Sequence, residues 1–133
     1  MSDEAAEPVW LDWRIVQALH ADQITRYGGA QGVRDIGLIQ SALARPTNKW
    51  HYENPDLFVL AAAYGFGIAK NHGFEDGNKR TAFLALYTFL GLNGYDLDAP
   101  EEEVVRIMEA VADGSLGEPE LAEWVRKRSV RIE

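Results

Sequence analysis

Two long apolar runs, separated by a short polar segment, constrain the fold of this chain more than any other feature. The runs are Leu57–Ala69 and Ala82–Leu92, and the polar segment between them covers residues 72–80. Each run has the length of a helix and almost no polar face, so each helix is expected to be buried in the centre of a helical bundle. Neither run reaches the about 20 residues that a membrane-spanning helix needs, so no membrane association is expected.

Two helices are predicted before the first apolar run from their caps and apolar spacing. The first is expected to begin after Asp12 and to end at Gly28, because aspartate is a favoured N-cap and glycine a favoured C-terminal residue. The second is expected to begin after Asp35 and to stop at Pro46, because proline interrupts a helix interior. The following segment, 46–54, shows no clear period and is predicted to be a loop.

The remaining helices are predicted from the same signals. Asn54 and Pro55 are expected to open the first central helix, and the second central helix is expected to cover residues 78–92. A fifth helix is expected to follow Asp98 as its cap, and a sixth to begin within residues 117–119. No stretch alternates with a period of two, so the chain is predicted to be all-α, a single-domain bundle of about six helices.

Length and composition limit the domain organisation and the classes of function. The 133 residues fit one domain, with residues 1–9 predicted to be a flexible tail and residues 10–130 the folded domain. The chain has no cysteine, which excludes thiolate chemistry and fits a cytoplasmic localisation. Its net charge of −8 argues against non-specific binding to nucleic acid, so no direct nucleic-acid contact is expected.

The polar segment between the central helices carries residues suited to chemistry on a phosphate group. It reads His-Gly-Phe-Glu-Asp-Gly-Asn-Lys-Arg from residue 72 to residue 80 and runs into the N-terminus of the second central helix. The free backbone N–H groups and the dipole of a helix make this end an anion site. Gly77 allows a tight turn, whereas Lys79 and Arg80 oppose the helix dipole unless an anion is bound. Such a local conflict with helix stability is expected of a functional site.

Each polar residue of this segment also has a purely structural explanation. His72 could bond the backbone at a helix end, Asp76 could be a helix cap, and the two cations could be solvated surface. Phe74 is expected to anchor the loop in the core under either explanation. The occurrence of all these residues at fixed spacing within nine positions favours the functional explanation.

The polar segment resembles the signature of the Fic/Doc superfamily, H-x-F-x-D-x-N-x-R, and is closest to the Doc (death-on-curing) branch. Residues 28–46 are similar to the N-terminal Doc pattern, and the helical layout is similar over about residues 10–128. The resemblance implies that His72 is a general base that takes a proton from a target hydroxyl, and that Asp76 binds the Mg²⁺ held by ATP. It also implies that phosphate or nucleotide is bound by Gly77, Asn78, Lys79 and Arg80.

Two departures from the most common Fic signature favour phosphoryl transfer over adenylyl transfer. Most adenylyl-transferring Fic enzymes have proline at the second position and glycine at the eighth, where this chain has Gly73 and Lys79. Lysine at the eighth position crowds the α-phosphate pocket and is typical of Doc proteins, which resemble kinases. The resemblance therefore implies a protein kinase that phosphorylates a hydroxyl of elongation factor Tu and arrests translation. Adenylyl transfer to a protein hydroxyl and a catalytically inactive binding module with the same fold are the alternatives.

The resemblance also implies a target-binding segment and a partner. Residues 46–52 resemble the superfamily's flap, which aligns an extended target peptide, and Trp50 and Tyr52 could contact the target or simply cover the core. The chain lacks the S/T-x-x-x-E-G/N pattern of self-inhibited Fic proteins. A toxin of a type II toxin–antitoxin system is therefore expected, restrained by a Phd-type antitoxin whose flexible end folds as a helix into a groove.

Overall fold

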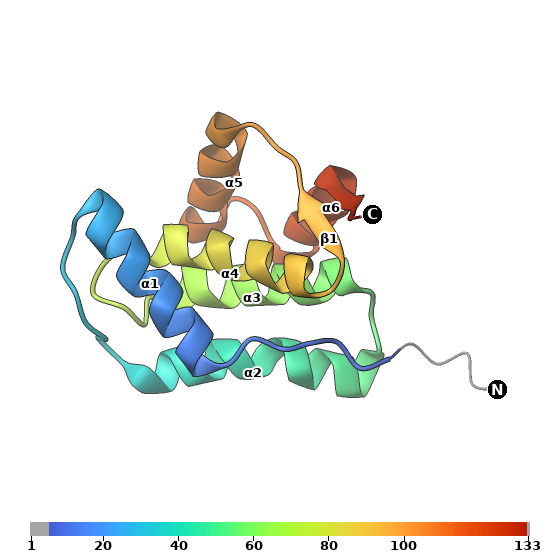
Figure 1. The fold of residues 1–133 in the computed structure, drawn as a ribbon, viewed down its shortest axis with the longest axis horizontal. Coiled ribbons are helices and arrows are strands. Elements are labelled where there is room, and N and C mark those ends of the chain that lie inside the picture. The colour runs from blue at the N-terminus through green and yellow to red at the C-terminus, as the bar shows by residue number, and fades with distance from the viewer. Residues whose placement is uncertain (1–5, 133) are drawn as a thin grey trace.

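The computed structural model describes residues 6–132, which form a helical bundle with one small sheet (Figure 1). The predicted all-α bundle of about six helices is confirmed for this part of the chain. The helices are α1 (Trp13–Tyr27), α2 (Ile36–Glu53), α3 (Leu57–Asn71), α4 (Asn78–Leu92), α5 (Glu101–Asp113) and α6 (Glu118–Arg128). Of the predicted tail, residues 1–5 lie outside the described residues. The Val9 N–H donates to the Asn93 side chain, and the same side chain donates to the Val9 carbonyl.

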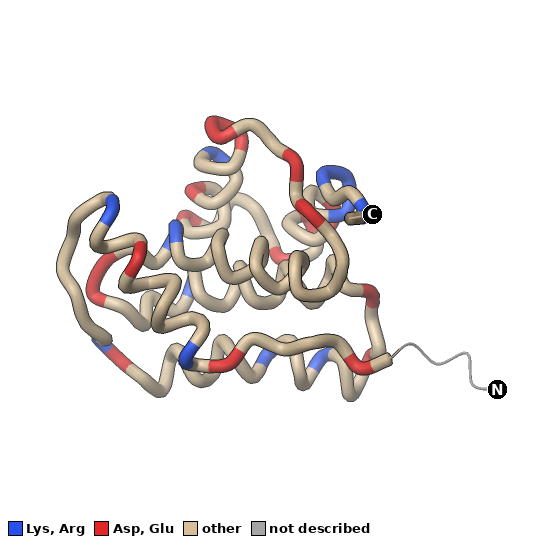
Figure 2. The backbone as a smooth tube through the Cα atoms, in the orientation of Figure 1, with Lys and Arg blue, Asp and Glu red and all other residues tan. Residues whose placement is uncertain are grey.

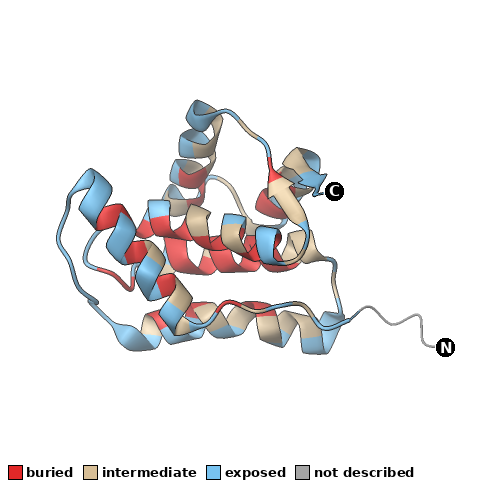
Figure 3. Cartoon of the chain, viewed as in Figure 1, coloured by how far each residue is buried: buried red, intermediate tan, exposed pale blue. Residues whose placement is uncertain are grey.

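The two apolar helices form the centre of the bundle, as predicted. α3 packs against α2, α4, α5 and α6, and α1 packs against α4. Figure 3 shows that buried residues concentrate on α3 and α4, whereas the outer helices are buried on one face. Since α3 and α4 are consecutive, the loop that joins them is attached at both ends to the most buried helices of the described residues. No helix among the described residues is both long and apolar enough to cross a membrane.

The caps predicted from local signals are present at α1 and at the start of α2. Asp12 accepts a hydrogen bond from the Ile15 N–H, and Gly28 ends α1 with a φ of 81°. Asp35 accepts hydrogen bonds from the first N–H groups of α2. Each of these bonds satisfies a backbone group that the helix end leaves without a partner.

The predicted end of α2 at Pro46 is wrong, because the helix continues for seven further residues. The Pro46 ring is fully buried, so its packing offsets the missing backbone hydrogen bond that would otherwise break the helix. The predicted loop 46–54 is therefore mostly helical. Asn54 is the C-cap of α2, with a φ of 50°, and Asp56 rather than Asn54 is the N-cap of α3.

Two short strands were not expected from the sequence. β1 (Tyr95–Leu97) pairs antiparallel with β2 (Ser129–Arg131), and Asp96 lies opposite Val130. Asp98 is not the cap of α5, because its N–H donates to the Arg128 carbonyl at the end of this sheet and Pro100 occupies the N-cap position. The sheet ties the segment after α4 to the end of the chain.

Candidate functional site

The polar segment 72–80 forms the loop between α3 and α4 and the first residues of α4, and His72 occupies its first position. His72 is the C-cap of α3 and has a left-handed backbone, with φ 52° and ψ 48°. The Arg34 guanidinium donates to the His72 carbonyl from Nε at 2.8 Å and from Nη2 at 2.5 Å. A cation at the C-terminus of a helix satisfies an unpaired carbonyl and interacts favourably with the helix dipole. The His72 residue is exposed, so its ring is accessible to a ligand.

The segment before α2, residues 32–35, lies along this loop. The Arg34 and Asp35 N–H groups donate to the Gly73 carbonyl at 2.8 Å and 3.0 Å, and the Glu75 N–H donates to the Gly32 carbonyl at 3.1 Å. Val33 and Phe74 form an isolated antiparallel bridge. The segment therefore holds the loop by backbone hydrogen bonds, a role for which the sequence offered no pattern.

The glycine at the second motif position is explained by the close approach of α2. A Cβ atom on Gly73 would lie 2.3 Å from Cγ1 of Ile39, a separation that real side chains essentially never show. Ile39 is itself buried in the core. A larger residue at position 73, proline included, would require the buried Ile39 to move.

Phe74 and Asn78 fasten the middle of the loop. Phe74 is 1% exposed, and its ring stacks on the His20 ring with 3.8 Å between centroids. The buried Asn78 side chain accepts from the Phe74 N–H and donates to the Phe74 carbonyl, both at 3.0 Å. The Asn78 amide group is therefore committed to the loop itself, and only the backbone of Asn78 contributes to the helix N-terminus.

Asp76 is exposed and is held by two groups from outside the loop. Its Oδ2 accepts a hydrogen bond from the Ala30 N–H at 2.7 Å, and its carbonyl lies 2.8 Å from Nε2 of His20. Among the described residues, no cluster of three or more His, Cys, Asp or Glu could hold a metal ion by itself. Mg²⁺ is commonly held by one or two carboxylates together with substrate phosphates and water. A single exposed carboxylate therefore fits a metal ion that arrives with a nucleotide.

The start of α4 has the properties of an anion site. Gly77 is the N-cap, with a φ of 76°, and it provides no side-chain hydrogen bond to the helix. The first turn carries Lys79 and Arg80 and no acidic residue. Figure 2 shows basic residues at the N-terminal end of α4, while acidic residues gather at the start of α5. Uncapped N–H groups and two cations together attract an anion.

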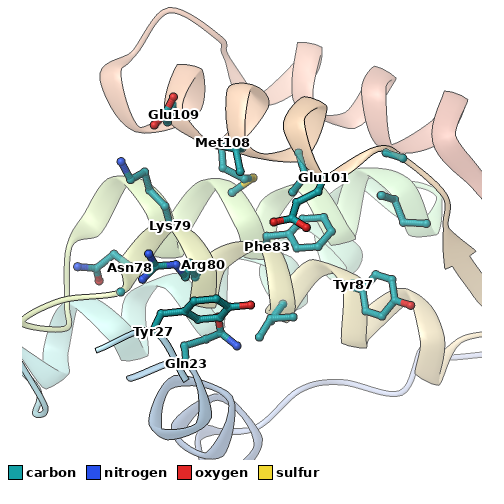
Figure 4. Close-up of a pocket in the computed structure, with 16 residues that line it drawn as sticks. Gln23, Tyr27, Asn78, Lys79, Arg80, Phe83, Tyr87, Glu101, Met108 and Glu109 are labelled. Carbon is teal, nitrogen blue, oxygen red and sulfur yellow. The ribbon is translucent and has the colours of Figure 1, made fainter. Parts of the chain in front are cut away.

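A cavity of about 690 Å³ extends from this helix end between α1, α4 and α5. Figure 4 shows Arg80 beside Tyr27, with the guanidinium carbon 4.7 Å from the ring centroid, and Lys79 extending toward α5. Farther inside, the walls are largely apolar and include Phe83 and Met108. The residues from α1 and α5 carry no local signal in the sequence, so sequence reasoning missed the cavity.

Trp50 and Tyr52 are not brought together with the loop. Both lie in the last turns of α2, whereas the loop contacts the start of that helix at Ile39, about 16 Å from Trp50 and about 20 Å from Tyr52 by helical rise. Trp50 packs edge-on against Trp10 and covers the core, and Tyr52 is 88% exposed. The prediction that residues 46–52 form a flap-like loop is wrong because this segment is helical.

Comparisons with known proteins find one matching family and two relatives at 35–45% identity. A protein-family model described as "Fic/DOC family" matches residues 10–90. The chain is 35% identical over 112 residues to "Protein kinase doc" of Escherichia phage P1, covering 83% of this chain and 87% of that protein. It is 45% identical over 75 residues to "Toxin Doc" of Mycolicibacterium smegmatis (strain ATCC 700084 / mc(2)155), covering 55% of this chain and 58% of that protein. The matched residues 10–90 contain the whole loop, α1 to α3 and nearly all of α4.

Proposed function

The chain belongs to the Fic/DOC family, and we propose that it is a Doc-type toxin that transfers the γ-phosphate of ATP to a protein hydroxyl. The observation that carries this proposal is the lysine in the first turn of α4. Lys79 and Arg80 line a nucleotide-sized cavity, and the loop directly before them in the chain carries the exposed His72 and Asp76. The relative named as a protein kinase, similar over most of both chains, supports the same activity.

In the proposed reaction, His72 is the general base. A neutral imidazole can accept the proton of a target hydroxyl near physiological pH. The ring is exposed at the end of α3, and the backbone that carries it is fixed by Arg34. The target hydroxyl would therefore approach from the solvent side of the loop, while the core side is closed by Phe74.

The phosphates would lie at the N-terminus of α4. Lys79, Arg80 and the free N–H groups of the first turn would bind the phosphate oxygens and stabilise the charge that develops during transfer. Asp76 would hold the Mg²⁺ that accompanies ATP, and this ion supplies neutralisation of phosphate charge. Gly77 leaves the backbone free of a side chain at this point, which allows close approach of the ligand.

The cavity between α1, α4 and α5 would hold the nucleoside. Its volume lies within the range of about 300–1,000 Å³ that is usual for small-molecule sites. Aromatic Phe83 and Tyr87 and the flexible Met108 offer the apolar contacts that a base requires. The polar phosphate end and the apolar inner part of the cavity match the two ends of a nucleotide.

Adenylyl transfer is the second candidate. Figure 4 shows that Lys79 extends toward α5 and away from Asn78 and Arg80. In this orientation the backbone of the anion site remains open, as binding of an α-phosphate would require. The two activities share His72 as base and differ in which phosphorus atom the hydroxyl attacks.

The products of the reaction separate the two candidates. Phosphoryl transfer converts ATP into ADP and a phosphorylated target, whereas adenylyl transfer releases pyrophosphate. We expect purified protein, incubated with ATP, Mg²⁺ and a bacterial extract, to form a phosphoprotein that is absent from extract alone, and we expect His72→Ala not to form it. Pyrophosphate release that depends on His72 would overturn the kinase proposal. Formation of the same phosphoprotein by His72→Ala would overturn the role of His72.

The proposed target is elongation factor Tu, and the proposed partner is a Phd-type antitoxin. The relative named "Toxin Doc" supports a toxin that is restrained in trans by a partner. Expression of the chain alone should arrest growth, and His72→Ala should not. Purified elongation factor Tu, used in place of the extract, should be phosphorylated. Failure to modify it would reject this target but would not contradict the proposed kinase activity.

A further inference from the structure

His20 is a buried histidine that has no part in the reaction proposed above. It lies on α1, is 6% exposed, and its ring is nearly parallel to the Phe74 ring, with 10° between the planes. Its Nε2 lies 2.8 Å from the Asp76 carbonyl. A carbonyl oxygen only accepts hydrogen bonds, so Nε2 must carry the proton. The contact therefore fixes both the tautomer of His20 and the direction of the Asp76 carbonyl.

The position of Asp76 depends on contacts from outside its loop, because the residue that follows it in the loop is a glycine. The next residue, Gly77, has a left-handed backbone and the wide conformational freedom of glycine. The Ala30 N–H holds the Asp76 carboxylate from the segment after α1, and a Cβ on Gly29 would lie only 3.2 Å from Cβ of Asp76. His20 and Ala30 thus hold the backbone and the side chain of the same aspartate.

We propose that His20 is a positioning residue that orients Asp76 toward the metal ion of the bound nucleotide. The inference rests on the proposed function, because it takes Asp76 as a ligand of that ion. Groups that hydrogen-bond a ligating residue typically change metal affinity by about 10- to 100-fold when they are removed. The stacking on Phe74 alone would give His20 only a role in stability, so the hydrogen bond and the stacking need to be tested separately.

Two substitutions separate these contributions. His20→Phe keeps an aromatic ring against Phe74 but removes the donor to Asp76. His20→Gln carries an N–H donor at about the reach of Nε2 but removes the ring. His20→Leu is a second variant without a donor, to be used if His20→Phe does not fold. The control is His51→Phe, which changes an exposed histidine in the last turn of α2.

The measurement is the affinity for Mn²⁺, used as a paramagnetic probe in the presence of a non-hydrolysable ATP analogue, together with the NMR shift of the Ala30 amide. We expect His20→Phe to weaken Mn²⁺ binding about 10- to 100-fold and to move the Ala30 amide signal. His20→Gln should stay within a few-fold of the unchanged protein and should retain that signal. Wild-type affinity in His20→Phe, equal losses in both variants, or a loss confined to His20→Gln would overturn the proposal.

One further variant distinguishes failure of this inference from failure of the proposed function. Asp76→Asn removes the carboxylate charge that is taken to bind the metal ion. If Asp76→Asn binds Mn²⁺ as the unchanged protein does, the role of Asp76 is wrong, and this inference falls with it. If Asp76→Asn loses Mn²⁺ binding while His20→Phe keeps it, the inference alone is wrong.

Discussion

At the scale of single residues, His72 has a backbone conformation that residues with a side chain rarely adopt. Among the described residues, only Asn54 shares a positive φ without being glycine. Such a conformation costs about 1–3 kcal/mol and persists only where the surroundings enforce it. Here Arg34 binds the carbonyl of His72, and two backbone N–H groups bind the next carbonyl, that of Gly73. The strain is therefore located at the residue proposed as the base.

The first prediction concerns Arg34. Arg34→Met keeps a long side chain but removes both hydrogen bonds to the His72 carbonyl, so the His72 backbone should leave the left-handed region. We expect kcat to fall about 10- to 100-fold while KM for ATP changes by less than about threefold, because a small misplacement of the base affects the chemical step. Steady-state kinetics and the Cα chemical shift of His72 measure the two effects.

The control for this prediction is Arg131→Met, at an exposed arginine in β2. It should leave both the kinetics and the His72 signal unchanged. A raised KM for the target protein with an unchanged His72 signal would show that Arg34 binds the target and does not position the base.

The second prediction concerns the contact between Gly73 and Ile39. Gly73→Ala places a methyl group against Cγ1 of Ile39, so it should lower the free energy of unfolding by about 1–3 kcal/mol, as overpacking does. Ile39→Ala removes the atom that collides. The double variant should therefore be less destabilised than the sum of the single variants in urea unfolding, and strict additivity would contradict the proposed collision.

At the scale of helices and strands, the elements with local signals could be predicted and those set by tertiary packing could not. Asp12 and Asp35 are adjacent in sequence to the helices they cap, and α4 was predicted at its observed bounds. The passage of α2 through Pro46 depends on burial of the proline ring against other helices, which the local sequence does not encode. β1 and β2 are three residues each, too short to show alternation, and pair across more than thirty residues.

The third prediction tests the corrected start of α3. Asp56 accepts a hydrogen bond from the Val59 N–H at 2.9 Å and pairs with Arg126 on α6, whereas Asp98 caps no helix. Asp56→Ala should lower the free energy of unfolding by about 1 kcal/mol, the usual effect of losing an N-cap. Asp98→Ala, the matched control, should change it by less than about 0.5 kcal/mol. Equal effects in urea unfolding would contradict the assignment of Asp56 as the cap.

At the scale of the whole molecule, the site is assembled from segments far apart in the chain. The nonapeptide could be identified from the sequence because its residues are contiguous. Arg34, His20 and Ala30 reach it from the region before α3, and Met108 reaches the cavity from α5. Only the packing of α1, α2 and α5 around α3 and α4 brings these residues together. Their positions in the sequence therefore follow no recognisable spacing.

The fourth prediction concerns the tie between the N-terminal segment and the core. The Tyr64 hydroxyl on α3 is hydrogen-bonded to the backbone of Leu11, and burial raises the pKa of Tyr64 to about 12. In the unfolded chain the phenol ionises near pH 10. The neutral phenol therefore stabilises the fold fully below about pH 10, and this contribution is lost as the pH rises from about 10 to about 12.

Tyr64→Phe tests this account, because it removes the ionisable group and keeps the ring. The difference in unfolding free energy between the unchanged protein and the variant should stay constant from pH 7 to about pH 9. Above about pH 10 the unchanged protein should lose stability relative to the variant. Parallel curves up to about pH 12 would mean that Tyr64 ionises in the folded chain as readily as in the unfolded chain.

The central claim is that this loop directs the γ-phosphate of ATP to a protein hydroxyl, and the mass of the modified target tests it most directly. Purified elongation factor Tu is incubated with the chain, ATP and Mg²⁺, and intact-mass spectrometry follows the target. The account predicts the mass gain of one phosphate, which is absent with His72→Ala and reduced with Lys79→Gly. A gain equal to an adenylate group would contradict it.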